Sequence, residues 1–245
     1  MTIILRKFNM KYIHYNSIVL IIGLHKTGKS YLTKDILYHH NEIPLGLVIS
    51  NKFSNKNVYH YIPSIYIHDE YNNEFIKKYV KKQIKSNQNT EYDTSNFIIF
   101  EDCLTMKDYK INKYLSKIFR APIELNTLCI VEALELEKIY KYLIMKNRID
   151  YIFITKNMIQ NSKKEIFDAI YSKIKIEFTV FCKFLDDYTD AYNCLVVYLK
   201  TESKYIEDKL FWYKANINPD FKMCCIESWQ YNHNHLIIEP NNKYI

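Results

Sequence analysis

A short segment near the start of the chain has the residues and the spacing of a phosphate-binding loop. It holds two of the chain's three glycines in the pattern G-x-x-x-x-G-K-S, directly after the apolar run at residues 18–22. Glycines here let the backbone approach an anion closely, and the loop amides together with the next helix N-terminus can cradle phosphates. We expect phosphate contacts from Gly23, Leu24, His25, Lys26, Thr27, Gly28, Lys29, Ser30 and Tyr31.

The lysine and the serine that end this pattern have separate expected roles. In such loops the lysine reaches the β- and γ-phosphates of ATP, and the hydroxyl group binds Mg²⁺. We therefore assign Lys29 to the phosphates and Ser30 to the metal. We also expect the Lys29 side chain to be exposed in the loop rather than packed in the core.

Two carboxylates follow a second apolar run, about 70 residues after the loop. Residues 97–100 are Phe-Ile-Ile-Phe, and Glu101 and Asp102 come next. In ATP hydrolysis one such carboxylate supports magnesium, and the other orients and deprotonates the attacking water. By position we assign Glu101 to the metal and Asp102 to the water. The swapped assignment, with Asp102 on the metal and no proper base, also fits the sequence.

The elements that position these residues alternate between strands and helices. Apolar runs predict strands at residues 18–22, 44–50, 64–68, 97–102, 127–131 and 151–155. Helical spacing predicts helices at residues 31–38, 72–86, 107–119 and 135–146. Such alternation favours an α/β fold, a mostly parallel sheet with helices on both faces. The lysines of residues 72–86 fit a solvated helix face.

Composition indicates one main domain. We predict a single domain over residues 1–231 and a polar C-terminal tail over 232–245. The net charge of +7 permits contact with nucleic acid without requiring it. Six cysteines without a C-x-x-C pair suit a reducing compartment. There is no signal-peptide pattern, and no apolar stretch approaches the 18 residues of a membrane-spanning helix.

The order of segments resembles a known family, the genome-packaging ATPases of large nucleocytoplasmic DNA viruses, which are P-loop motors of the FtsK/HerA group. The resemblance covers roughly residues 15 to 216. The stretches that carry it are residues 23–37, 47–50 with 62–71, 97–103, 149–154, and 194–197 with 208–215, the last of which contains Phe-Trp-Tyr-Lys-Ala.

The resemblance implies a P-loop NTPase fold of the RecA/FtsK type and a function: an ATP-driven motor that moves double-stranded viral DNA into the capsid. It implies ATP and Mg²⁺, a ring of identical subunits, and contacts to the DNA backbone. It also implies capsid or membrane-associated assembly proteins as partners. The implied location is the host cytoplasm, at the viral factory, and the virion.

The sequence departs from the family at two places. Such motors have Gln or Asn as a γ-phosphate sensor after the strand that follows the acidic pair, and this chain has Glu132. The family's Gly-Arg-His segment is absent, which leaves Arg120 and Arg148 as candidates to complete a neighbour's site. A degenerate nucleotide-binding subunit with an assembly or regulatory role is therefore a second hypothesis. A P-loop nucleotide kinase is a third, although three arginines supply little for an arginine-rich lid.

Overall fold

The computed structural model describes residues 4–50, 58–88, 93–156 and 160–238 of the chain. These residues form one nine-stranded sheet in the order β1-β9-β8-β7-β2-β6-β5-β3-β4. The strands are β1 (Arg6–Lys7), β2 (Ile18–Ile22), β3 (Leu45–Ser50), β4 (Ile67–His68), β5 (Asn96–Glu101), β6 (Thr127–Ala133), β7 (Tyr151–Ile154), β8 (Asn193–Tyr198) and β9 (Leu210–Lys214).

The sheet is mostly parallel, as the sequence predicts. Only β8 runs against its neighbours, since it pairs antiparallel with β7 and β9, while every other strand pair is parallel. Strand β2, which leads into the phosphate loop, lies between β6 and β7. The carboxyl ends of β2, β5, β6 and β7 therefore meet at one edge of the sheet, and we call the opposite edge the amino edge.

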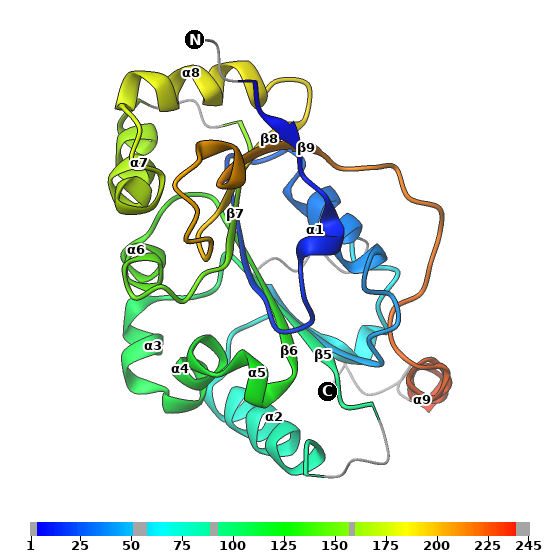
Figure 1. Ribbon diagram of the computed structural model, residues 1–245. Helices are drawn as coiled ribbons and strands as arrows, with labels where there is room; N and C mark the ends of the chain where they lie inside the picture. Colours follow the sequence, from blue (N-terminus) through cyan, green and yellow to red (C-terminus); the bar gives the residue numbers. More distant parts are fainter. Residues whose placement is uncertain (1–3, 51–57, 89–92, 157–159, 239–245) are drawn as a thin grey trace.

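Helices cover both faces of the sheet (Figure 1). On one side lie α1 and α9, and on the other lie α2 to α8. The helices are α1 (Lys29–Tyr38), α2 (Asn73–Ser86), α3 (Met106–Ile111), α4 (Lys113–Arg120), α5 (Pro122–Leu125), α6 (Lys138–Met145), α7 (Gln160–Ile174), α8 (Phe178–Tyr188) and α9 (Ile226–Ile238), with 3₁₀ turns at Met10–Tyr12, Ser64–Tyr66 and Ile206–Asp208.

Two hydrophobic cores fill the space between the sheet and these layers. Successive residues of a strand point to opposite faces, so Val19 and Ile21 of β2 join the core beneath α1, while Leu20 and Ile22 join the core beneath the larger helical layer. Strands β2, β5, β6 and β7 are buried on both faces, which explains why the sequence shows them as continuous apolar runs.

The structure modifies the sequence-based boundaries at residues 107–119. The expected single helix is two helices, because Asn112 ends α3 and caps α4, where its Oδ1 accepts hydrogen bonds from the backbone N–H groups of Tyr114 and Leu115. Helices α7 and α8 had no counterpart among the predicted elements.

The division of the chain at residue 232 stays a prediction. Helix α9 runs across that point, and the Oδ1 atom of buried Asn232 accepts hydrogen bonds from Ser64 Oγ at 2.9 Å and from the N–H of Ile65 at 3.0 Å.

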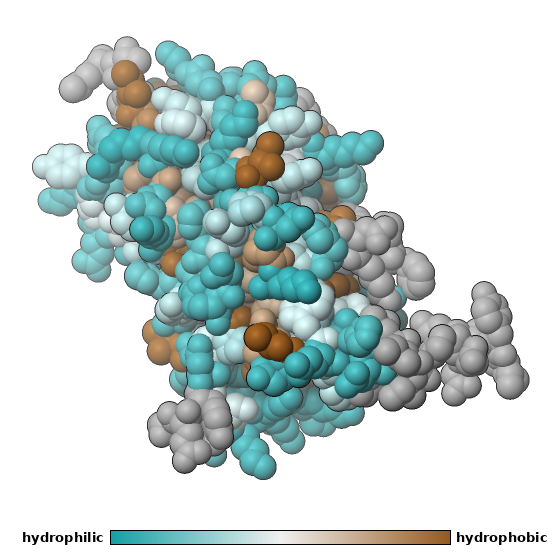
Figure 2. Space-filling view, turned by 90° about the vertical axis from the view of Figure 1, so that its right-hand side faces the viewer, coloured by the Kyte–Doolittle hydropathy of each residue, from teal (hydrophilic) through white to brown (hydrophobic). Residues whose placement is uncertain are grey.

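The face viewed in Figure 2 is largely hydrophilic. Outside the grey residues, its hydrophobic side chains are scattered among hydrophilic ones. Among the described residues, no helix combines the length and the apolar character needed to span a bilayer.

Candidate nucleotide-binding site

The phosphate loop lies at the carboxyl end of β2 and leads directly into α1. Its two glycines adopt positive φ angles, +155° at Gly23 and +96° at Gly28, which caps α1 in the left-handed region. A Cβ atom at Gly23 would lie 1.9 Å from Thr155 Oγ1. Glycine is therefore required at position 23 by close packing as well as by backbone conformation.

Two threonines hold the loop against β7. Thr27 Oγ1 and Thr155 Oγ1 are hydrogen-bonded at 2.6 Å, and Thr27 Oγ1 also donates to the Leu24 carbonyl at 2.7 Å. Thr155 is fully buried and follows directly on β7, the parallel neighbour of β2. Thr155 was not among the residues predicted for the site. The sequence signal for Thr155 was its position at the end of a predicted strand, residues 151–155.

The ammonium group of Lys29 lies inside the phosphate loop. Its Nζ donates to the carbonyl oxygens of Gly23 at 2.8 Å and Leu24 at 3.0 Å. The residue is only 8% exposed, so the expectation of an exposed side chain is wrong. Two carbonyl oxygens of the loop hold the ammonium group, so a positive charge lies within the loop that is assigned to the phosphates.

Glu132 lies between the phosphate loop strand and the acidic pair. In the sheet register it stands opposite Ile21 of β2 on one side and opposite Glu101 of β5 on the other. Its carboxylate accepts hydrogen bonds from two hydroxyl groups of α1, Thr33 Oγ1 at 2.6 Å and Ser30 Oγ at 3.4 Å. Glu132 thus faces the start of the phosphate-binding helix.

Tyr59 joins the two glutamates. Its hydroxyl donates to Glu101 Oε2 at 3.1 Å and lies 3.4 Å from Glu132 Oε1. The side chain is fully buried, and burial together with the two carboxylates raises its pKa well above 10, so it remains a donor at neutral pH. Sequence reasoning missed Tyr59 because it belongs to an irregular segment whose place depends on tertiary packing.

Burial raises the pKa of Glu132 to about 7. The negative charge of Glu101 also raises it, while the Thr33 hydrogen bond and the Lys29 charge act in the opposite direction. Repulsion between this carboxylate and a nearby γ-phosphate would therefore be weaker near neutral pH than that of a fully ionised group, because part of the population carries a protonated Glu132.

The acidic pair diverges at the end of β5. Glu101 is buried and reaches Tyr59 on the α1 side of the sheet. Asp102 has a left-handed backbone (φ +47°), and its Oδ1 accepts from the N–H of Leu134, beyond the end of β6, at 3.0 Å. This divergence gives the two carboxylates different surroundings, so they are suited to different roles.

The oxygen donors here fit magnesium. Mg²⁺ prefers oxygen ligands and takes one or two carboxylates, with phosphate and water oxygens completing its shell. Ser30 and Glu101 both connect to the Glu132–Tyr59 network, and Asp102 adjoins Glu101. In the described part of the chain, no group of three or more His, Cys, Asp or Glu side chains is arranged to bind a metal by itself, so phosphate oxygens would be needed.

Helix α1 is anchored by β9 and by the segment that follows it. Asp35 is fully buried, and its carboxylate accepts hydrogen bonds from Tyr213 OH at 2.7 Å, from the N–H of Asn216 at 3.0 Å and from Asn218 Nδ2 at 2.8 Å. The Phe-Trp-Tyr-Lys-Ala stretch thus contributes a residue that positions the phosphate-binding helix.

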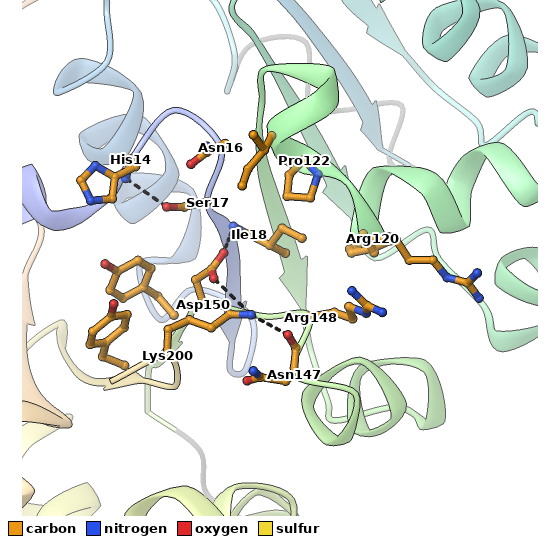
Figure 3. A pocket seen from close by; sticks show the side chains of 14 residues that line it. His14, Asn16, Ser17, Ile18, Arg120, Pro122, Asn147, Arg148, Asp150 and Lys200 are labelled. Atoms are coloured by element: carbon orange, nitrogen blue, oxygen red, sulfur yellow. Dashed lines mark hydrogen bonds and ion pairs between the residues drawn. The ribbon is translucent and has the colours of Figure 1, made fainter. Parts of the chain in front are cut away.

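Arg120 and Arg148 lie away from the phosphate loop of their own chain. Both line a pocket that also includes Ile18 and Tyr151, the first residues of β2 and β7 (Figure 3). This pocket is at the amino edge, whereas the loop follows the carboxyl end of β2. Their assignment to the nucleotide site stays a prediction, and it applies only to the site of a neighbouring copy.

Sequence relatives come from large DNA viruses. The chain is 26% identical over 233 residues to the uncharacterized protein L437 of Acanthamoeba polyphaga mimivirus, covering 86% of this chain and 77% of the relative. It is 29% identical over 215 residues to the uncharacterized protein 088R of Invertebrate iridescent virus 3, covering 85% and 81%. No protein-family model matches the sequence.

Solved structures share the fold. The genome packaging NTPase B204 of Sulfolobus turreted icosahedral virus 2, in complex with AMPPCP, superposes with a TM-score of 0.60 at 14% identity, covering 84% of this chain and all of that one. The pCW3 conjugation coupling protein TcpA, with ATPγS, gives 0.51 at 10% identity, covering 92% and 66%. These similarities confirm the predicted P-loop ATPase fold and the predicted resemblance to viral packaging ATPases.

Proposed function

We propose that this protein is an ATPase that drives double-stranded viral DNA into the capsid during virion assembly. The observation that carries the proposal is the convergence of the phosphate loop, the acidic pair and Glu132 at one edge of the sheet. The fold shared with the packaging NTPase B204 supports the same role.

The residues of the site would divide the work as follows. The loop amides and Lys29 hold the β- and γ-phosphates, since the ammonium group already lies within the loop. Ser30 and Glu101 would hold Mg²⁺, which neutralises charge on the phosphate oxygens when bound. Asp102 orients the attacking water and accepts its proton. Thr33 and Tyr59 fix the positions of Glu132 and Glu101.

The partners in this proposal are DNA and further copies of the chain. A translocase cannot depend on sequence, so its DNA contacts are to backbone phosphates and are sensitive to salt. In a ring, the amino-edge arginines of one copy are available to the site of the next. Capsid or membrane-associated assembly proteins would dock at the viral factory in the host cytoplasm.

A nucleotide-binding subunit with little hydrolysis is the second candidate. The observation in its favour is Glu132, a carboxylate buried within reach of Ser30, where packaging motors of this group carry an uncharged amide. Such a protein would bind ATP at the same loop and serve in assembly or regulation.

An ATPase assay with and without duplex DNA tests the proposal. We expect turnover that duplex DNA stimulates, and we expect Lys29→Ala to abolish tight ATP binding, measured by calorimetry, because the triphosphate loses its counter-charge. Equal ATP affinity of this variant and the parent would refute the phosphate-loop assignment. If both the parent and Glu132→Gln bind ATP but show no DNA-stimulated turnover, the second candidate replaces the motor.

A further inference from the structure

A basic groove crosses the amino edge of the sheet and holds all three arginines of the chain. One hollow is lined by Arg120, Arg148 and Lys200, and a second by Arg6 and Lys7. Both hollows include His14, Tyr151 and Tyr198, so they adjoin and form one surface. We call this surface the amino-edge groove; Figure 3 shows the part around Arg120 and Arg148.

The acidic groups of the groove already have partners. Asp150 accepts a hydrogen bond from the N–H of Ile18 at 2.6 Å, and its other oxygen lies 3.6 Å from Lys200 Nζ. Asp208 pairs with Arg6 at 2.9 Å. These two carboxylates stand against five basic side chains, so the lining carries a net positive charge.

Two of the arginines have charge to offer a ligand. Within the described ranges, the side chains of Arg120 and Arg148 take part in no hydrogen bond or ion pair, and both line the same hollow. Two guanidinium groups near one another repel each other, and an anion between them relieves this repulsion. Guanidinium groups bind phosphate oxygens through paired N–H donors, which gives geometry as well as charge.

Aromatic rings give this surface a rigid base. The rings of Tyr151 and Tyr198 stack at 4.8 Å with an interplanar angle of 14°, and Tyr151 OH donates to the Tyr12 carbonyl at 2.7 Å. At the other end, the Arg6 guanidinium lies over the ring of Phe211, which lines the same hollow, at 5.9 Å. Basic side chains interleaved with aromatic rings are typical of nucleic-acid-binding surfaces.

We propose that the amino-edge groove binds the phosphodiester backbone of DNA. This inference rests on the proposed function and assigns its DNA contact to named residues. Because the groove lies at the edge opposite the phosphate loop, DNA and nucleotide can occupy one chain together. The phosphates of DNA would also neutralise the charges of Arg120 and Arg148, so these arginines do not require the nucleotide of a neighbouring copy.

The test measures affinity for a labelled duplex by fluorescence anisotropy over a series of salt concentrations. Removing two phosphate contacts in the double variant Arg120→Ala/Arg148→Ala should weaken binding on the order of tenfold and lower the slope of log K against log salt by about 2. The double variant Arg120→Lys/Arg148→Lys should recover much of the affinity. The charge-matched control Lys81→Ala/Lys82→Ala, on the exposed face of α2, should change affinity less than about twofold.

Other outcomes separate failure of the groove from failure of the proposed function. An equal loss of affinity in both alanine variants overturns the groove, because general charge then explains binding. If Arg120→Ala/Arg148→Ala keeps its duplex affinity and loses ATP turnover, the arginines act in the nucleotide site of a neighbouring copy instead. Binding of labelled polyglutamate that the Arg120→Ala/Arg148→Ala variant loses, with duplex affinity unchanged, identifies an acidic protein partner instead. If the parent binds ATP but neither duplex nor single-stranded DNA, the motor function itself fails.

Discussion

Replacing Glu132 with glutamine should stabilise the protein at alkaline pH. The Glu132 carboxyl is fully buried between α1 and Tyr59, and its pKa is raised from 4.5 to about 7, first by burial and then by Glu101. Because the folded-state pKa lies above the ordinary value, the protonated form favours folding at low pH. That contribution is lost as the pH rises from about 4.5 to 7.

The magnitude follows from the linkage between pKa and stability. Each tenfold change in a proton-binding constant corresponds to ~1.4 kcal/mol, so ionising Glu132 costs the folded state on the order of 3 kcal/mol well above pH 7. Most of this cost, roughly 2.5 kcal/mol, develops between pH 5 and pH 8. Glutamine keeps an acceptor for Thr33 Oγ1 and has no charge, so the variant lacks the cost.

Urea denaturation of both proteins at pH 5 and pH 8 measures the effect. The difference in unfolding free energy between variant and parent should grow by roughly 2.5 kcal/mol in favour of the variant from pH 5 to pH 8. Other titrating groups are common to the two proteins and cancel in this comparison. A difference independent of pH would show that Glu132 is ionised over the whole range, and the argument from its burial would be wrong.

Three further predictions concern the same edge of the sheet. Asp102→Asn should bind Mg-ATP normally and hydrolyse it poorly, whereas Glu101→Gln should lower the affinity for magnesium. Magnesium titrations of ATP turnover measure both effects. If the two phenotypes are reversed, the swapped assignment of the carboxylates is supported. Gly23→Ala should lower the unfolding free energy by at least ~2 kcal/mol in thermal denaturation, because its Cβ would meet Thr155. Gly28→Ala should lower it by only ~1 kcal/mol, because the nearest atom to its Cβ is 3.6 Å away. Equal losses in the two variants would contradict the packing argument. Tyr59→Phe should lose about 1.5–3 kcal/mol at pH 8, the usual range for a hydrogen bond to a charged group, and an unchanged unfolding curve would show that its hydroxyl does not stabilise the glutamates.

Local patterns in the sequence predicted the central strands and the phosphate loop. Strands β2, β5, β6 and β7 are buried on both faces and therefore appear as apolar runs. The loop appears through its glycines, because the backbone and the packing at position 23 accommodate only glycine. The position of Glu132 was likewise evident, because it stands near the end of one of these runs.

Contacts between distant segments could not be predicted in this way. Tyr59 reaches the two glutamates from an irregular segment, and Asp35 is bonded by residues about 180 positions later. The sequence could have predicted that Arg148 lies away from the phosphate loop. Arg148 precedes one strand of a parallel sheet, and the phosphate loop follows another, so the two lie at opposite edges of the sheet. The exposure of Lys29 was misjudged because its partners are carbonyl groups of the loop itself.

The bonds to Asp35 also bear on how the chain is made. The phosphate loop is synthesised before Tyr213, Asn216 and Asn218, yet its helix buries a carboxylate, Asp35, whose partners are these three residues. A nascent chain that ends before Tyr213 leaves the Asp35 carboxylate without these partners. Strand β2 likewise cannot pair with β6 and β7 until both have been synthesised. Such contacts between distant segments make folding slow. The buried face of the phosphate-binding helix is therefore complete only after the chain has been synthesised through Asn218.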